Sequence, residues 1–190
     1  MIQEKLNLLQ RGLSRGSINI GLDGNFAPWV GTLIPFKKQN ILIIADDGRE
    51  EEVVTRLARI GYDNAIGYLQ GGFDTWKNAG KAVNCIESIS ANELTGRARE
   101  NSLKIVDVRK EAEFVRGHVQ GAVNLPLDDI NEKLSLLGKN ETYYVHCAAG
   151  YRSMVFISIL KARGYDNLVD IDGGFAAIKN NCEELLDTVI

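Results

Sequence analysis

The sequence has few cysteines and histidines, and this scarcity limits the chemistry that the chain can support. It contains three cysteines, Cys85, Cys147 and Cys182, and two histidines, His118 and His146. An odd, widely spaced set of cysteines is a poor framework for disulfide bonds and is typical of a reducing compartment. Two histidines are too few for a histidine-built zinc or di-iron centre, so the sequence predicts no protein-bound metal.

Long hydrophobic runs and a strong charge imbalance are also absent. No stretch of about 18 apolar residues occurs, which argues against a membrane-spanning helix. The net charge of −3 gives no electrostatic reason to expect nucleic acid or a membrane surface as a partner. The first residues, MIQEKLNLLQRGLSRG, lack the apolar core and the cleavage site of a secretory signal. We therefore expect a cytoplasmic protein.

The chain contains two copies of one sequence pattern. The segment RLARIGYDNAIGYLQGGFDTW at 56–76 matches ILKARGYDNLVDIDGGFAAIK at 159–179. Upstream of these, GSINIGLD at 16–23 matches GAVNLPLD at 121–128, so the matching pieces follow the same order in both halves. A repeat of this length indicates two related domains.

We place the two domains at residues 1–84 and 85–190. The first copy is shorter at its front, and we expect it to lack a counterpart of the strand-like IVDVR at 105–109. This difference fits either the tail of a longer protein or a domain that has lost an element.

Strand and helix signals alternate in the second copy. KIVDV, AVNLP, YYVHC and NLVDI are short apolar runs typical of strands. Ser90, followed by Glu93, has the capping-box pattern of a helix start. One helical stripe that ends before Gly164 is formed by Val155, Phe156, Ile159 and Leu160. The alternation predicts an α/β fold with a mostly parallel sheet flanked by helices.

Cys147 follows one of these strands and precedes a helix, the place where parallel sheets gather functional groups. The helix start offers unpaired N–H groups, and a tight turn of Ala148, Ala149 and Gly150 can direct further N–H groups at an anion. Together with Arg152, such surroundings lower a cysteine pKa from about 8.5 to about 3.5–7.5, so we expect a thiolate. This interpretation requires a thiol that solvent can reach. The alternative is a small buried hydrophobic residue.

Three stretches of the second copy together resemble the rhodanese (sulfurtransferase) superfamily. They are IVDVRKEAEFVRGHVQGAVNLP, the loop CAAGYRS and GYDNLVDIDGGF, and they cover essentially all of residues 88–180. The resemblance implies two tandem rhodanese-like domains and an enzyme without a cofactor. Cys147 would accept a sulfane sulfur from thiosulfate or a low-molecular-weight persulfide and pass it to a thiol or cyanide.

The resemblance also implies a binding role for the rest of the loop. The residues expected to surround the anionic donor are Ala148, Ala149, Gly150, Tyr151, Arg152 and Ser153. In DVRKEAEF, Asp107, Arg109 and Glu113 are expected to be structural, with an ion pair that joins strand to helix. For His118 we expect a hydrogen-bonded structural role rather than that of a general base. His146 directly precedes the nucleophile on a strand and should face the other side, so we assign it no catalytic role.

The first copy differs at the decisive loop. ADDGREEE places Ala45, or Asp46 if the gap is positioned differently, where the second copy has Cys147. The stretch DDGREEE also carries five carboxylates and one arginine, which should repel anions. We expect this domain to be catalytically silent.

The tandem arrangement is also similar to the carboxyl-terminal half of metallo-β-lactamase–rhodanese fusions that oxidise persulfides. The metal-binding domain of these fusions is absent from this sequence, so dioxygenase activity is not implied. A separate metallo-β-lactamase-fold dioxygenase is a candidate partner, and a homo-oligomer is a further candidate assembly.

Two alternatives remain open beside sulfur transfer. One is a non-catalytic sulfur-sensing or interaction module in which Cys147 only stores sulfur. The other is a small cysteine-based phosphatase. Such phosphatases place five residues between cysteine and arginine, whereas four separate Cys147 from Arg152 here, and the shorter loop suits a single sulfur better than a phosphate.

Overall fold

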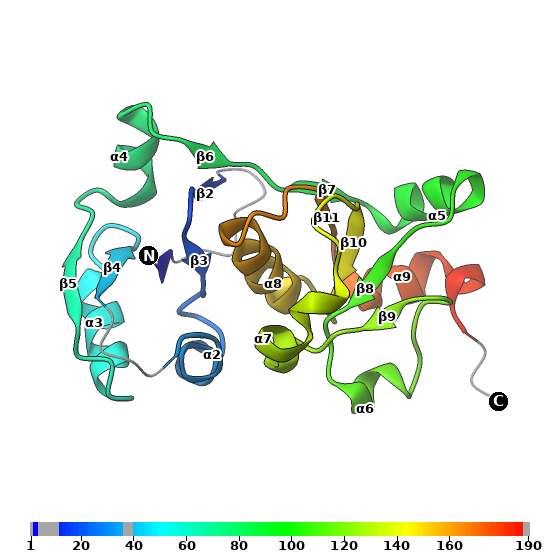
Figure 1. Cartoon of the computed structure of the whole chain (residues 1–190), viewed down its shortest axis with the longest axis horizontal. Coiled ribbons are helices and arrows are strands. Elements are labelled where there is room, and N and C mark those ends of the chain that lie inside the picture. The colour runs from blue at the N-terminus through cyan, green and yellow to red at the C-terminus, as the bar shows by residue number, and fades with distance from the viewer. Residues whose placement is uncertain (1, 4–11, 36–39, 188–190) are drawn as a thin grey trace. The chain divides into compact units, whose positions relative to one another are not determined.

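The computed structural model describes residues 2–3, 12–35 and 40–187, and the chain divides into two compact units (Figure 1). The first unit extends to Cys85 and includes Lys161–Arg163, and the second comprises Ile86–Leu160 and the chain from Gly164 onward. In the described part of the chain, no helix combines the length and the apolar character needed to cross a membrane.

The second unit is built on a parallel five-stranded sheet, as the α/β prediction requires. Its strands, in spatial order, are β7 (Glu87–Ile89), β11 (Leu168–Ile171), β10 (Tyr143–His146), β8 (Ile105–Asp107) and β9 (Val123–Asn124). The helices are α5 (Ala91–Glu100), α6 (Glu111–Phe114), α7 (Ile130–Lys133), α8 (Tyr151–Ala162) and α9 (Gly174–Asn181). Since all neighbouring strands are parallel, their carboxyl ends meet at one edge of the sheet.

The predicted start of α5 is confirmed. Ser90 Oγ accepts a hydrogen bond from Glu93 N at 3.2 Å, and Glu93 Oε2 accepts one from Ser90 N at 2.8 Å. The predicted helix ending before Gly164 is also present as α8. Its buried surface is wider than one stripe, because every residue from Ser153 to Leu160 is buried.

One face of this sheet is covered by α5 and α9. Leu94 of α5 and Ile178 of α9 are fully buried in a cluster with Val169 and Ile171 of β11. Each buried aliphatic side chain of this size stabilises the fold by roughly 1.5–3 kcal/mol. Because successive strand residues face opposite sides, Asp170 lies on the other face of β11, towards α8.

The first unit contains a smaller parallel sheet. Its strands, in spatial order, are β3 (Ile18–Asn19), β1 (Ile2–Gln3), β4 (Ile41–Ile44) and β5 (Ala65–Tyr68). Its helices are α2 (Phe26–Leu33), α3 (Glu50–Ala58) and α4 (Gly72–Asn78). A separate antiparallel pair joins β2 (Leu13–Ser14) to β6 (Val83–Asn84).

The expectation that the first copy lacks a counterpart of IVDVR is wrong. Strand β1 pairs with β3 and β4, just as β8 pairs with β9 and β10. The sequence comparison missed it because β1 has only two residues and does not share the IVDVR pattern.

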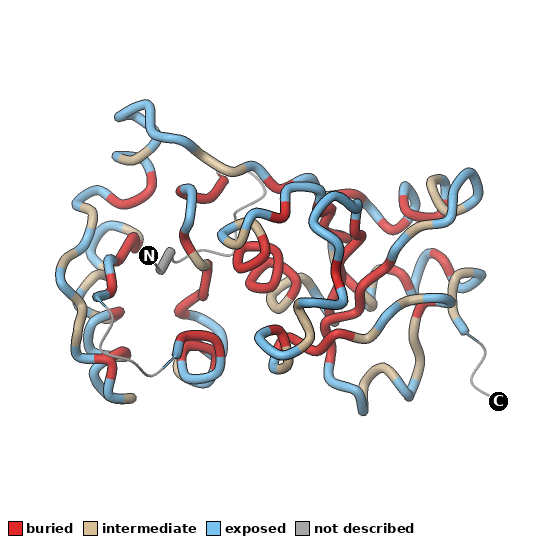
Figure 2. Tube along the Cα trace, viewed as in Figure 1, coloured by how far each residue is buried: buried red, intermediate tan, exposed pale blue. Residues whose placement is uncertain are grey.

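Within the described residues, the first unit has no strand or helix placed like β7 and α5. One consequence is seen at Leu42, which occupies the position of Tyr144 in the repeat. Leu42 is 48% exposed, whereas Tyr144 is buried in the cluster that contains Leu94 of α5. Figure 2 shows the same contrast between the two sheets, with β10 and β11 mostly buried and β5 partly to fully exposed.

Candidate functional site

Cys147 lies directly after β10 and four residues before Tyr151, the first residue of α8. The chain turns back at Gly150, whose φ of +104° is in the left-handed region that favours glycine. This turn directs the Gly150 N–H at the thiol, and its hydrogen bond to Cys147 Sγ is 3.1 Å long. The local arrangement therefore brings a backbone donor and a helix start to the predicted nucleophile.

The start of α9 holds the other side of the loop. Phe175 N donates to the carbonyl oxygen of Cys147 at 2.7 Å, and Ala176 N donates to that of Ala148 at 3.1 Å. The backbones approach so closely that a Cβ at Gly174 would collide with the Cys147 carbonyl oxygen. The sequence analysis assigned no role to Gly174, although the shared GGF of the two copies was a signal for it.

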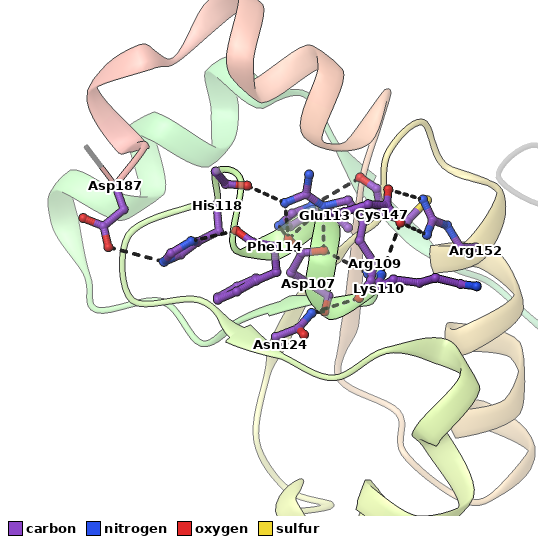
Figure 3. Close-up of polar contacts among 12 residues, drawn as sticks. Asp107, Arg109, Lys110, Glu113, Phe114, His118, Asn124, Cys147, Arg152 and Asp187 are labelled. Atoms are coloured by element: carbon purple, nitrogen blue, oxygen red, sulfur yellow. Dashed lines mark hydrogen bonds and ion pairs between the residues drawn. The ribbon is translucent and has the colours of Figure 1, made fainter. Parts of the chain in front are cut away.

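Arg152 is engaged by a carboxylate of the same unit. Its Nη1 and Nη2 atoms donate to Glu113 Oε2 and Oε1 at 2.6 and 2.9 Å (Figure 3). The hydrogen bond from Arg152 lowers the pKa of Glu113, and the bond to Glu113 raises the pKa of Arg152, with a smaller contribution from Cys147. Glu113 thus joins α6 to α8, and a donor-binding role for Arg152 remains a prediction.

Asp107 and Arg109 form the expected ion pair. Arg109 Nη2 lies 2.6 Å from Asp107 Oδ2, and the two side chains are only 5% and 0% exposed. Arg109 Nη2 also donates to the Gly117 carbonyl oxygen at 2.8 Å, and its guanidinium carbon lies 3.8 Å from the centre of the Phe175 ring. Because Phe175 N binds the Cys147 carbonyl oxygen, the pair supports the loop through α9.

Cys147 itself is 1% exposed, so the expectation of a thiol open to solvent is wrong for this conformation. The other two cysteines differ in their surroundings. Cys85 is exposed, whereas Cys182 is buried and its Sγ donates to the Ala91 carbonyl oxygen at 3.1 Å. Reaction of Cys147 with a donor therefore requires a local opening of the loop.

Ser153 lies beneath the loop rather than at its rim. Its Oγ is 3.0 Å from the Gly150 carbonyl oxygen and 2.8 Å from Asp170 Oδ1. Asp170 is 1% exposed, and burial raises its pKa to about 6. The sequence analysis missed Asp170, for which the available signal was an aspartate inside the apolar strand LVDI.

The two histidines occupy different environments. His146 is fully buried, its Nδ1 is 3.3 Å from the Cys147 carbonyl oxygen, and burial lowers its pKa. Its Nε2 has no hydrogen-bond partner among the described residues, and Asp107 Oδ2 is 3.9 Å away. His118 Nδ1 lies 3.1 Å from the Phe114 carbonyl oxygen and its ring stacks on Phe114, which fits the expected structural role. No group of three metal-ligating side chains is found in the described ranges.

In the first unit, Ala45 occupies the place of Cys147. A Cβ at Gly72 would collide with the Ala45 carbonyl oxygen, the same relation that Gly174 has to Cys147. The alternative alignment with Asp46 is therefore wrong. The loop that follows is held by an ion pair of 2.9 Å between Arg49 and Asp23.

The family described as "Rhodanese-like domain" matches residues 9–79 and 90–181. The chain belongs to the rhodanese-like domain family. The two matched ranges confirm the tandem arrangement of this rhodanese-like protein.

Several known proteins are similar to part of this rhodanese-like chain. Thiosulfate sulfurtransferase GlpE of Shewanella oneidensis is 28% identical over 95 residues, which cover 50% of this chain and 94% of GlpE. The putative sulfur carrier protein YrkF of Bacillus subtilis is 29% identical over 75 residues, and the match spans only 40% of each protein. A crystal structure of a rhodanese-like domain protein from Staphylococcus aureus has a TM-score of 0.50 at 34% identity, covering 55% of this chain and 100% of that chain.

Proposed function

We propose that this rhodanese-like protein is a sulfurtransferase that carries a sulfane sulfur on Cys147. The observation that supports this most directly is the 3.1 Å hydrogen bond from Gly150 N to Cys147 Sγ, at the start of the 12-residue helix α8. A backbone donor and the positive end of a helix dipole both favour a negatively charged sulfur. The same groups would stabilise a thiolate and the terminal sulfur of a persulfide.

Transfer takes place in two displacement steps. The Cys147 thiolate attacks the sulfane sulfur of thiosulfate, and the S–S bond of the donor breaks as sulfite leaves with the bonding electron pair. A thiolate or cyanide then attacks the terminal sulfur of the persulfide, and Cys147 leaves as a thiolate. The electrons balance without an external oxidant, and a low-molecular-weight persulfide can replace thiosulfate as the donor.

Binding of an anionic donor involves the loop and Arg152. The N–H groups of Ala148 and Ala149 and the ring of Tyr151 are the remaining candidate contacts. Because Glu113 already occupies the Arg152 guanidinium, a donor anion must compete with this carboxylate. If the ion pair between Arg152 and Glu113 opens, the Arg152 guanidinium becomes available to bind the donor beside the buried thiol.

A second candidate function is supported by the 1% exposure of Cys147. A nearly buried thiol suits a sulfur-sensing or storage module, in which the persulfide is formed slowly and remains protected. In both cases the first unit would be catalytically silent, because Ala45 replaces the nucleophile. A metallo-β-lactamase-fold persulfide dioxygenase is the partner that we propose to test by co-purification.

Thiocyanate formation from thiosulfate and cyanide distinguishes these functions. We expect the wild type and the Cys85→Ser control to be active, because Cys85 is exposed and lies outside the loop, and Cys147→Ser to be inactive. Thiocyanate formation that persists in Cys147→Ser would overturn both functions of this thiol. A wild type without turnover that gains the mass of one sulfur on Cys147 after persulfide treatment would favour the sensing module.

A further inference from the structure

The second unit contains a buried carboxyl group that the transfer steps do not use. Asp170 lies on β11 and is 1% exposed. In the sheet it pairs with Ser88 of β7 on one side and with Val145 of β10 on the other. A buried carboxyl group is costly unless it is hydrogen-bonded, and two hydroxyl groups bind this one.

The two hydroxyl groups connect Asp170 to different elements. Ser88 Oγ donates to Asp170 Oδ2 at 3.3 Å, and Ser153 Oγ donates to Asp170 Oδ1 at 2.8 Å. Burial raises the pKa of Asp170, the charge of Asp172 on the following turn raises it further, and both serine hydrogen bonds lower it. Its partners in the sheet are thus Ser88 of β7 and Val145 of β10, and Ser153 of α8 supplies the second hydroxyl group.

Ser153 is also a neighbour of the loop that contains Cys147. Its Oγ is 3.0 Å from the Gly150 carbonyl oxygen, while Gly150 N donates to Cys147 Sγ. A serine hydroxyl has one proton, so it cannot donate fully to both acceptors. When Asp170 is ionised, its carboxylate can only accept hydrogen bonds. The Ser153 hydroxyl then donates to it in a charge-assisted hydrogen bond, which is stronger than a bond to a neutral acceptor.

Protonation of Asp170 changes this arrangement. A neutral carboxyl group can donate its own proton to Ser153 Oγ, and the serine proton then becomes available to the Gly150 carbonyl oxygen. The charge-assisted attachment of the first turn of α8 to β11 is lost in this state. The position of Gly150, and with it the donor to Cys147 Sγ, therefore depends on the state of Asp170.

We propose that Asp170 is a positioning residue: its hydrogen bond with Ser153 anchors the first turn of α8, and with it the adjacent Gly150, whose N–H donates to Cys147 Sγ. Its catalytic consequence rests on the proposed sulfur transfer, but its effect on the thiol does not. With Asp170 ionised, the first turn of α8 is anchored and the Cys147 thiolate is stabilised. With Asp170 neutral, the anchor weakens and the thiol is less reactive.

The test is the pH dependence of Cys147 alkylation by iodoacetamide, measured by mass spectrometry of the Cys147 peptide. We expect Asp170→Asn and Ser153→Ala to lower the rate at pH values above the Asp170 titration roughly two- to tenfold, the range that one net hydrogen bond contributes. The control is Ser158→Ala, because Ser158 is buried in the same helix and donates to the Val155 carbonyl oxygen three residues back. We expect its profile to match the wild type.

Ser88→Ala separates positioning from general structural support. This change removes a hydrogen bond that lowers the pKa of Asp170 and leaves Ser153 in place. We therefore expect the acid limb of the alkylation profile to move to higher pH, with an unchanged rate once Asp170 is ionised. The ¹³C shift of the Asp170 carboxyl group should show the same displacement without any reaction of Cys147.

The outcomes are distinct. Wild-type profiles in Asp170→Asn and Ser153→Ala, or a Ser88→Ala profile that does not move, would overturn the positioning role. If this happens while thiocyanate formation still depends on Cys147, the proposed function stands alone. If the profiles behave as expected but Cys147→Ser still makes thiocyanate, the positioning role stands and sulfur transfer through Cys147 fails.

Discussion

Gly174 lies so close to Cys147 that any side chain at position 174 would overlap the Cys147 carbonyl oxygen. This contact joins the start of α9 to the loop after β10, and two hydrogen bonds from α9 N–H groups accompany it. The loop is thus shaped by a segment that is distant in the sequence.

The first prediction concerns this contact. We expect Gly174→Ala to destabilise the protein by about 1–3 kcal/mol more than Gly121→Ala, because overpacking adds to the backbone strain. Gly121 is the matched control, since its φ of +72° is also left-handed but open space surrounds it. Urea unfolding measures both losses, and equal losses would contradict the steric role.

The second prediction concerns the buried ion pair. We expect Arg109→Met to lower the free energy of unfolding by about 3–5 kcal/mol, because it leaves the Asp107 carboxylate unpaired in the interior. Arg99→Met is the control, because its pair with Glu184 is exposed and spans 3.5 Å, and exposed pairs contribute about 0–1 kcal/mol. Denaturant unfolding of both variants tests this, and a loss below about 1 kcal/mol for Arg109→Met would count against it.

The third prediction is a pH dependence of stability. The pKa of Asp170 is about 6 in the folded protein and returns towards 3.8 on unfolding, so the folded state binds this proton more tightly. The resulting stabilisation is complete below pH about 4 and is lost as the pH rises through about 6, a change of roughly 2–3 kcal/mol. We expect Asp170→Asn to remove this slope. Unfolding of both proteins at several pH values would show it, and parallel curves would refute it.

The fourth prediction compares the three thiols of the native protein. We expect iodoacetamide to modify exposed Cys85 fastest and Cys182 only on global unfolding, because Cys182 lies in the core between α5 and α9. Cys147 should react at an intermediate rate through local opening of its loop. Peptide mass spectrometry gives the three rates in one experiment. Equal protection of Cys147 and Cys182 would leave no route for a sulfur donor.

Local patterns predicted much of the second unit. Three elements could be predicted from the sequence because their determinants lie within a few residues of one another. They are the Ser90–Glu93 capping box, the strand that ends at His146 and the helix that ends before Gly164. Strand β1 could not be predicted from the sequence, because two residues are too few to show a strand pattern. Its pairing with β3 and β4 in the folded protein defines it.

The sequence by itself determined the α/β class, the tandem repeat and the placement of Cys147 between a strand and a helix, since alternation, spacing and turn chemistry are local properties of the chain. Only the tertiary structure decided that Cys147 is buried, that Glu113 binds Arg152 and that Asp170 meets Ser153. These contacts join residues 39 and 17 positions apart, and they arise when separate strands and helices pack together. Packing sets burial and hydrogen-bond partners, and no short-range pattern encodes it.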